Sequence, residues 1–166
     1  MLYDKLMEEI TIYAKELGEE PAVRTYEDLI LQLKVPRLSL WFCMTFKSAN
    51  VMEHQKLVYG QGTADQIYHF AAHVNGADRT KAKLLLLEKG DARLLILFTR
   101  LPGEDVSDID DFILSLKEPS ISALFLSELE RFGKKAPNSS KHKELIKMST
   151  SKESAHTYLL NKKKKK

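Results

Sequence analysis

The 166-residue chain contains one cysteine, five prolines, seven glycines and no long apolar run. A single cysteine, Cys43, cannot form an intramolecular disulfide, which favours a reducing compartment. The longest aliphatic runs, 84–87 and 94–97, are far too short to cross a bilayer. The first residues also lack the pattern of a signal peptide. We therefore expect a cytoplasmic protein without a transmembrane segment.

The sequence also lacks the motifs of the common enzyme classes. No serine lies in a Gly-x-Ser-x-Gly elbow, and Cys43 sits inside an apolar segment, where a small buried residue is the simpler interpretation. Gly60-Gln61-Gly62 could hold a phosphate at a helix start, but it has neither a third glycine nor a following lysine, so a structural turn is favoured. We expect no enzymatic activity and no cofactor.

One group of residues could bind a metal ion. Asp65, His69 and His73 are spaced four residues apart on a predicted helix, and carboxylate with imidazole suits divalent metals. The apolar residues of that helix lie on its opposite side, so a solvated helix face explains the same three residues. No cysteine pair or internal glutamate completes a zinc motif. We favour the solvated face and assign no metal site.

Charge is distributed unevenly along the chain. Residues 1–130 contain 14 Lys/Arg and 21 Asp/Glu, whereas residues 131–166 contain 12 and 2. The chain ends in five lysines: Lys162, Lys163, Lys164, Lys165 and Lys166. A block of like charge cannot bury itself and attracts partners of opposite sign. We therefore divide the chain into an acidic domain, 1–133, and a basic, largely flexible tail, 134–166, with at most one marginal helix that is ordered where it docks.

Hydrophobic periodicity predicts the elements of the acidic domain. Apolar residues at spacings of three and four predict helices over 2–17, 25–35, 63–74, 106–116 and 121–132. Thr63 followed by Gln66 has the pattern of a capping box. Alternating or continuously apolar segments predict strands over 38–47, 54–59, 83–88 and 92–99. Turn residues at 48–50 and 89–91 join these strands into two hairpins.

The predicted order is α-α-β-β-α-β-β-α-α, which defines an α+β fold with an antiparallel sheet of about four strands and about five helices. The hairpin-then-helix order occurs twice, but no internal repeat is convincing. The second hairpin is apolar on both faces, so either helices cover both faces or one face is an interface. We favour coverage by helices.

Two functions fit these observations. The first is a non-enzymatic adaptor or small chaperone-like module that binds a protein partner or a second copy of itself. Trp41 is its candidate contact, because aromatic residues are enriched where partners bind, although packing beneath a helix is the commoner role. Over about residues 1–120 the predicted element order and acidic charge resemble the small chaperones of bacterial secretion systems.

The alternative function is binding of nucleic acid, or of another anionic surface, through Lys162 to Lys166. Each lysine can neutralise a phosphate and release counterions, which gives affinity without sequence specificity. The same run is compatible with anionic lipid, an import receptor or the acidic body of the chain itself. The sequence does not separate these partners.

Overall fold

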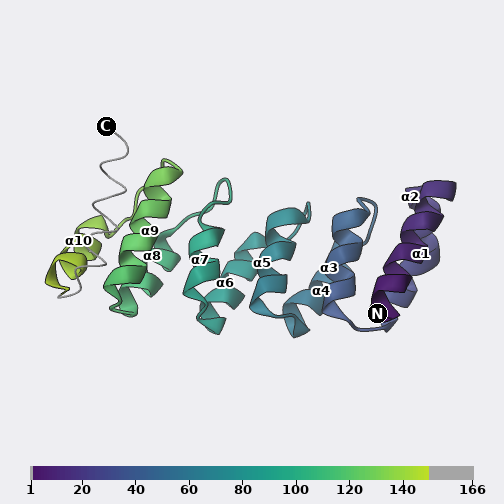
Figure 1. Ribbon diagram of the computed structural model, residues 1–166, viewed down its shortest axis with the longest axis horizontal. Coiled ribbons are helices and arrows are strands. Elements are labelled where there is room, and N and C mark those ends of the chain that lie inside the picture. The colour runs from purple at the N-terminus through teal and green to yellow at the C-terminus, as the bar shows by residue number, and fades with distance from the viewer. Residues whose placement is uncertain (1, 150–166) are drawn as a thin grey trace. The chain divides into compact units, whose positions relative to one another are not determined.

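The computed structural model describes residues 2–149, and these residues form ten α-helices and no strand (Figure 1). They divide into two compact units, which meet in sequence between Lys89 and Gly90. Within residues 2–149, none of the helices combines the length and the apolar content needed to cross a membrane. Lys162 to Lys166 lie outside the described residues.

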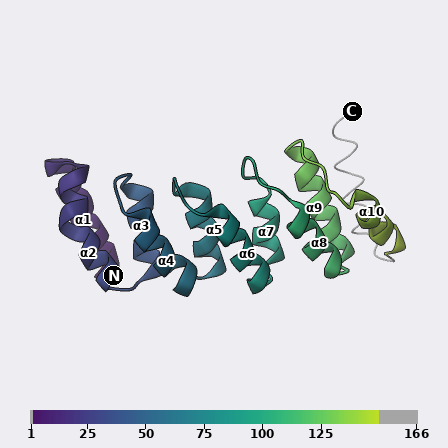
Figure 2. The same ribbon diagram turned by 180° about the vertical axis from the view of Figure 1, so that it is seen from behind.

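The first unit contains three helical hairpins. Their helices are α1 (Leu2–Leu17), α2 (Glu19–Gln32), α3 (Pro36–Thr45), α4 (Val51–Gln61), α5 (Ala64–His73) and α6 (Arg79–Lys89). Helices α1 and α2, α3 and α4, and α5 and α6 pack side by side within each hairpin, and α3 also packs against both α2 and α5 (Figures 1 and 2). Each hairpin buries its apolar stripe against the next one, which is how tandem helical repeats build a continuous core.

A recurring hydrogen bond joins each hairpin of the first unit to the next. The Glu27 side chain on α2 accepts from the backbone N–H of Asn50, the N-cap of α4. In the same way, Gln55 on α4 accepts from the backbone N–H of Asp78, directly before α6, at 2.7 Å. The acceptor lies 23 residues before the donor in both cases. The second helix of one hairpin therefore fixes where the second helix of the following hairpin begins.

The second unit begins at Gly90 and contains four described helices: α7 (Ala92–Phe98), α8 (Ser107–Ser115), α9 (Pro119–Arg131) and α10 (Ser139–Met148). Helices α7, α8 and α9 pack against one another, and α10 packs against α9. His142 and Ile146 of α10 are buried. Residues 139–148, which were assigned from sequence to the tail, thus form a helix that docks on α9.

The predicted sheet, and with it the α+β class, is wrong: residues 38–47, 54–59, 83–88 and 92–99 lie mainly in α3, α4, α6 and α7. Leu38, Phe42 and Phe46 are buried, but Met44 between them is half exposed, which is a helical spacing and not a strand alternation. Consecutive residues of α7, Leu94 to Ile96, are all buried, because this short helix is packed on several sides by α8 and α9. The resemblance to secretion chaperones rested on the predicted element order and on acidic charge, and the all-helical order of residues 2–149 removes the first of these two grounds.

The caps and breaks between elements were predicted better than the types of the elements. Thr63 and Gln66 form the expected reciprocal capping box at the start of α5. At the predicted turn 89–91, Gly90 adopts a positive φ of 69°, and the Asp91 side chain accepts from Leu94 N–H to cap α7. The predicted hairpin turn is therefore a break between two helices.

A sequence motif recurs in the two units. Seven positions keep their order, six with the same residue type and one with a carboxylate in both copies. Five additional residues separate the phenylalanine from the asparagine in the second copy. Lys34 and Lys117 both adopt a left-handed backbone, with φ of 52° and 53°. The matched pairs are Glu27 and Asp110, Lys34 and Lys117, Pro36 and Pro119, Ser39 and Ser122, Phe42 and Phe125, Asn50 and Asn138, and His54 and His142. The chain therefore contains an internal repeat that hydrophobic periodicity did not reveal.

Candidate partner-binding surface and buried histidine clusters

Trp41 lies on α3, not on a strand as predicted from the sequence. Its indole is half-buried and meets the rings of Phe42 and Phe46 edge-on, at centroid distances of 6.2 and 5.9 Å. Phe42 and Phe46 are almost fully buried, so Trp41 lies at the border between the core and the surface. This position leaves part of an aromatic ring available to a partner while its base is held by the core.

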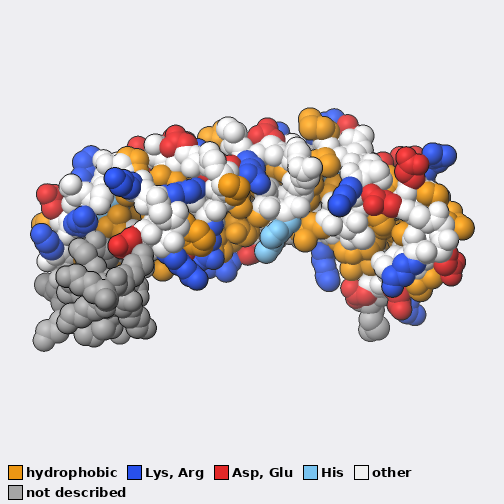
Figure 3. Space-filling view, turned by 90° about the horizontal axis from the view of Figure 1, so that it is seen from above, with side chains coloured by type: hydrophobic (Ala, Val, Ile, Leu, Met, Phe, Trp, Pro, Cys, Tyr) orange, Lys and Arg blue, Asp and Glu red, His pale blue; other side chains and the backbone are white. Residues whose placement is uncertain are grey.

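The helix α5 packs against α3 and carries His69 and His73. Both are exposed, and their rings stack at 5.5 Å with an interplanar angle of 18°. Trp41 and His69 are each the sixth residue after the N-cap of their helix, and α3 packs against α5. Histidine side chains form part of the surface seen in Figure 3. The predicted solvated face of α5 is confirmed.

Asp65 is exposed on α5, but it does not join His69 and His73 in a metal site. Within residues 2–149, no three histidine, cysteine or carboxylate side chains are grouped closely enough to hold a metal ion. His54, the nearest other histidine in sequence, is fully buried against Ser39 on α3. Within residues 2–149, the structure thus brings His69 and His73 together and places no further metal ligand beside them.

Gly62 at the α4–α5 junction has a steric reason to be glycine. A Cβ at this position would lie 2.4 Å from the carbonyl oxygen of Val58, which is closer than real contacts allow. The following N–H, of Thr63, already donates to the Gln66 side chain. This segment is therefore a tight connection between two helices, in agreement with the structural turn favoured from sequence.

The second unit contains a fully buried Ser–His–Asp cluster. His142 Nδ1 lies 2.9 Å from Ser122 Oγ, and His142 Nε2 lies 2.7 Å from Asp110 Oδ1. The second carboxylate oxygen of Asp110 accepts from both the backbone N–H and the side-chain amide of Asn138. The cluster joins α8, α9 and α10, and so it holds the last described helix in place.

The first unit contains the matching cluster on α2, α3 and α4. His54 Nδ1 lies 2.9 Å from Ser39 Oγ, and the ring packs 5.3 Å from that of Phe42. His54 Nε2 lies 3.3 Å from Glu27 Oε1 but is not aligned for a hydrogen bond. Burial lowers the pKa of His54, and the Glu27 and Glu53 carboxylates only partly oppose this effect.

Serine, histidine and a carboxylate are also the components of hydrolase triads, but these two clusters have a different role. Ser39, His54, Ser122 and His142 have no exposed surface, so no substrate can reach either hydroxyl. The Asp110–His142–Ser122 cluster pairs both nitrogens of its buried imidazole, whereas in the first cluster the contact with Ser39 pairs Nδ1 of His54 and leaves Nε2 without a hydrogen bond. Neither cluster was predicted from the sequence, although the shared Pro-x-x-Ser-x-x-Phe segments beginning at Pro36 and Pro119 were a usable signal.

Cys43 is buried on α3, in agreement with its expected role as a small core residue rather than a nucleophile. Burial raises the pKa of its thiol to about 12, and the nearby Glu27 carboxylate adds to the shift. At neutral pH the thiolate, which is the reactive form, is therefore almost absent.

Comparison with known protein families, with curated proteins and with solved structures finds no match for this chain. The class of protein rests on the fold: residues 2–149 are all-helical, and the first unit stacks helical hairpins.

Proposed function

We propose that the chain is a non-enzymatic adaptor that binds a protein partner, or a second copy of itself, through the exposed face of α3 and α5. The observation that carries this proposal is that a part-exposed Trp41 and an exposed His69 occupy the same position, the sixth after the N-cap, on two helices that pack together. Met44, half exposed on α3, adds apolar surface to the same helix. Trp and Met are enriched in interface cores, where charged residues are depleted.

Stacked helical hairpins support the proposal, because they present side chains from successive helices at a constant spacing. A fold alone does not define a function, so the argument rests on the residues of this face. A reducing, cytoplasmic location is part of the proposal and is supported by the single buried cysteine.

Light scattering during size-exclusion chromatography tests the proposal on protein purified from its own host at physiological salt. We expect a mass above the 19.0 kDa of one chain, with a protein-like ratio of absorbance at 260 and 280 nm. Met44→Glu should return the protein to the monomer mass, because a charge in an interface core must be desolvated. Leu84→Glu, at an exposed apolar position on α6, is the matched control and should keep the complex.

A monomer in the unmodified protein, or equal loss of the complex in both variants, would contradict binding at this face.

The alternative function is nucleic-acid binding through Lys162 to Lys166. Exposed lysines on α10, Lys141 and Lys147, favour it because they extend the same positive charge onto the folded domain. A nucleic-acid absorbance ratio that disappears in high salt would transfer the function to these lysines.

A further inference from the structure

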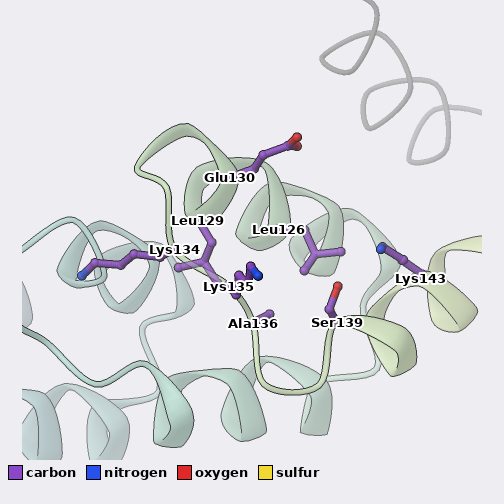
Figure 4. Close-up of a pocket in the computed structure, with 8 residues that line it drawn as sticks. All are labelled: Leu126, Leu129, Glu130, Lys134, Lys135, Ala136, Ser139 and Lys143. Atoms are coloured by element: carbon purple, nitrogen blue, oxygen red, sulfur yellow. The ribbon is translucent and has the colours of Figure 1, made fainter. Parts of the chain in front are cut away.

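A groove of about 340 Å³ lies beside α9 and α10 in the second unit (Figure 4). Its floor is apolar and consists of Leu126 and Leu129 from α9 and Ala136 from the connection to α10. All three are nearly fully buried, so their exposed atoms face the groove. The volume is at the lower end of the range for ligand pockets, enough for one or two side chains of a partner.

The rim of the groove is polar and positively charged. Lys135 and Lys143 are exposed, and within residues 2–149 neither ammonium has a hydrogen-bond or ion-pair partner. In Figure 4, Lys143 extends from α10 toward Leu126, and the Ser139 hydroxyl lies between the two helices. Two cations and a hydroxyl donor thus border an apolar floor.

A third lysine of the groove has a different role. Lys134 Nζ donates to the backbone carbonyls of Thr99 and Leu101, at 2.6 and 2.8 Å, and its side chain points away from the floor in Figure 4. This residue anchors the end of α9 to the segment after α7. The charge offered to a ligand therefore comes from Lys135 and Lys143.

The surroundings keep this charge positive. Residues 131–149 contain six Lys/Arg and a single acidic residue, Glu144. Glu128 on α9 forms an ion pair with Arg100, with Nη2 and Oε2 2.9 Å apart. Glu130 at the rim points away from the floor in Figure 4. A negatively charged group entering the groove would meet a favourable potential.

We propose that this groove binds a short acidic peptide segment of a protein partner. An apolar side chain of the segment lies on the Leu126, Leu129 and Ala136 floor, and flanking carboxylates pair with Lys135 and Lys143. The inference rests on the proposed protein-binding function and adds the chemistry of the partner. It concerns a different surface from the α3–α5 face.

The aliphatic floor of the groove favours a peptide over a nucleic acid as the ligand. Single-stranded nucleic acids gain much of their affinity by stacking bases on aromatic side chains. None of the side chains that line the groove is aromatic, so a base has no ring to stack on. A Leu or Ile side chain fits an aliphatic floor, and carboxylates supply the charge that complements the rim.

Fluorescence anisotropy of the full chain with labelled peptides tests the proposal. The probe is Glu-Asp-Leu-Glu-Leu-Asp-Glu, and its control, with both leucines changed to serine, has the same charge. We expect the leucine peptide to bind at least about fivefold more tightly, because only it fills the floor. Lys135→Glu/Lys143→Glu should weaken its binding at least about tenfold, because both flanking cations become anions.

The matched control is Lys141→Glu/Lys147→Glu, which makes the same charge change on exposed positions of α10 outside the groove. It should weaken binding less than about threefold at 150 mM salt, where distant exposed charges are screened. Lys135→Gln/Lys143→Gln gives a milder change, with an intermediate loss, and circular dichroism checks that each variant is folded.

Three results would overturn the proposal: no binding of the leucine peptide, equal losses in the two glutamate variants, or tighter binding of a thymidine 12-mer that the groove variant abolishes. The last would make this a nucleic-acid site. If Met44→Glu removes the partner seen by light scattering while the unmodified chain binds no leucine peptide, the adaptor function stands and the groove proposal fails.

Discussion

Asp110 Oδ1 lies 2.7 Å from His142 Nε2, and neither side chain has any exposed surface. The same carboxylate accepts two hydrogen bonds from Asn138, directly before α10. One residue of α8 therefore supports both the start and the interior of α10, together with the Ser122 contact from α9.

Removing this carboxylate should destabilise the protein strongly. We expect Asp110→Ala to lower the free energy of unfolding by about 3–5 kcal/mol, because His142 and Asn138 would lose a buried partner. Asp111→Ala, one position along, loses one exposed contact to Asn138 and should cost less than about 1 kcal/mol. Urea unfolding followed by circular dichroism measures both; similar values would contradict a central role for Asp110.

The buried His54 should make stability depend on pH. Burial lowers its pKa in the folded protein, so the unfolded chain takes up a proton at higher pH than the folded chain does. The stabilising effect of neutral His54 is fully present above the ordinary value of about 6.5. It is lost as the pH falls from there toward the folded-state pKa, by up to about 1.4 kcal/mol per pH unit.

Urea unfolding of the wild type and of His54→Gln at pH 8, 7, 6 and 5 checks this expectation. The variant should lose less stability than the wild type between pH 7 and pH 5. His69→Gln replaces an exposed histidine and should follow the wild-type curve. If His54→Gln and the wild type lose the same stability, His54 does not cause the dependence.

The left-handed backbone at Lys117 should favour glycine. Its φ of 53° places the Cβ in a strained position, and glycine removes that strain at a smaller cost in chain entropy. We expect Lys117→Gly to raise the free energy of unfolding by about 0.5–1 kcal/mol. Lys15→Gly, inside helix α1, should lower it by about 1 kcal/mol. Thermal melts measure both signs, and destabilisation by Lys117→Gly would refute the argument.

Sequence reasoning located the boundaries of this fold better than its element types. The helix over 2–17 and the capping box at Thr63 followed from local patterns and are confirmed. Segments such as 38–47 failed because a short apolar run satisfies a strand and a buried helix equally, and only packing decides between them. In this segment Leu38 and Phe42 are buried and Met44 is exposed, which is the burial pattern of a helix and not of a strand.

The candidate site was accessible from sequence only in part. Trp41 and the solvated His69 and His73 could be identified, because each stands out within its own segment. The two histidine clusters bring together residues from three helices each, and only a comparison of the two Pro-x-x-Ser-x-x-Phe segments with each other singles out Ser39 and Ser122. The groove at Lys135 and Lys143 likewise depends on a helix, α10, that forms because it docks on α9.

The hydrogen bonds from Asn50 N–H to Glu27 and from Asp78 N–H to Gln55 give the first unit a direction. Each acceptor lies on the hairpin before that of its donor. The middle hairpin therefore donates from Asn50 to the hairpin before it and accepts at Gln55 from the hairpin after it. A duplicated hairpin would carry both halves of this arrangement with it. A chain of this kind can therefore grow by copying one segment, without a new interface having to arise for each addition.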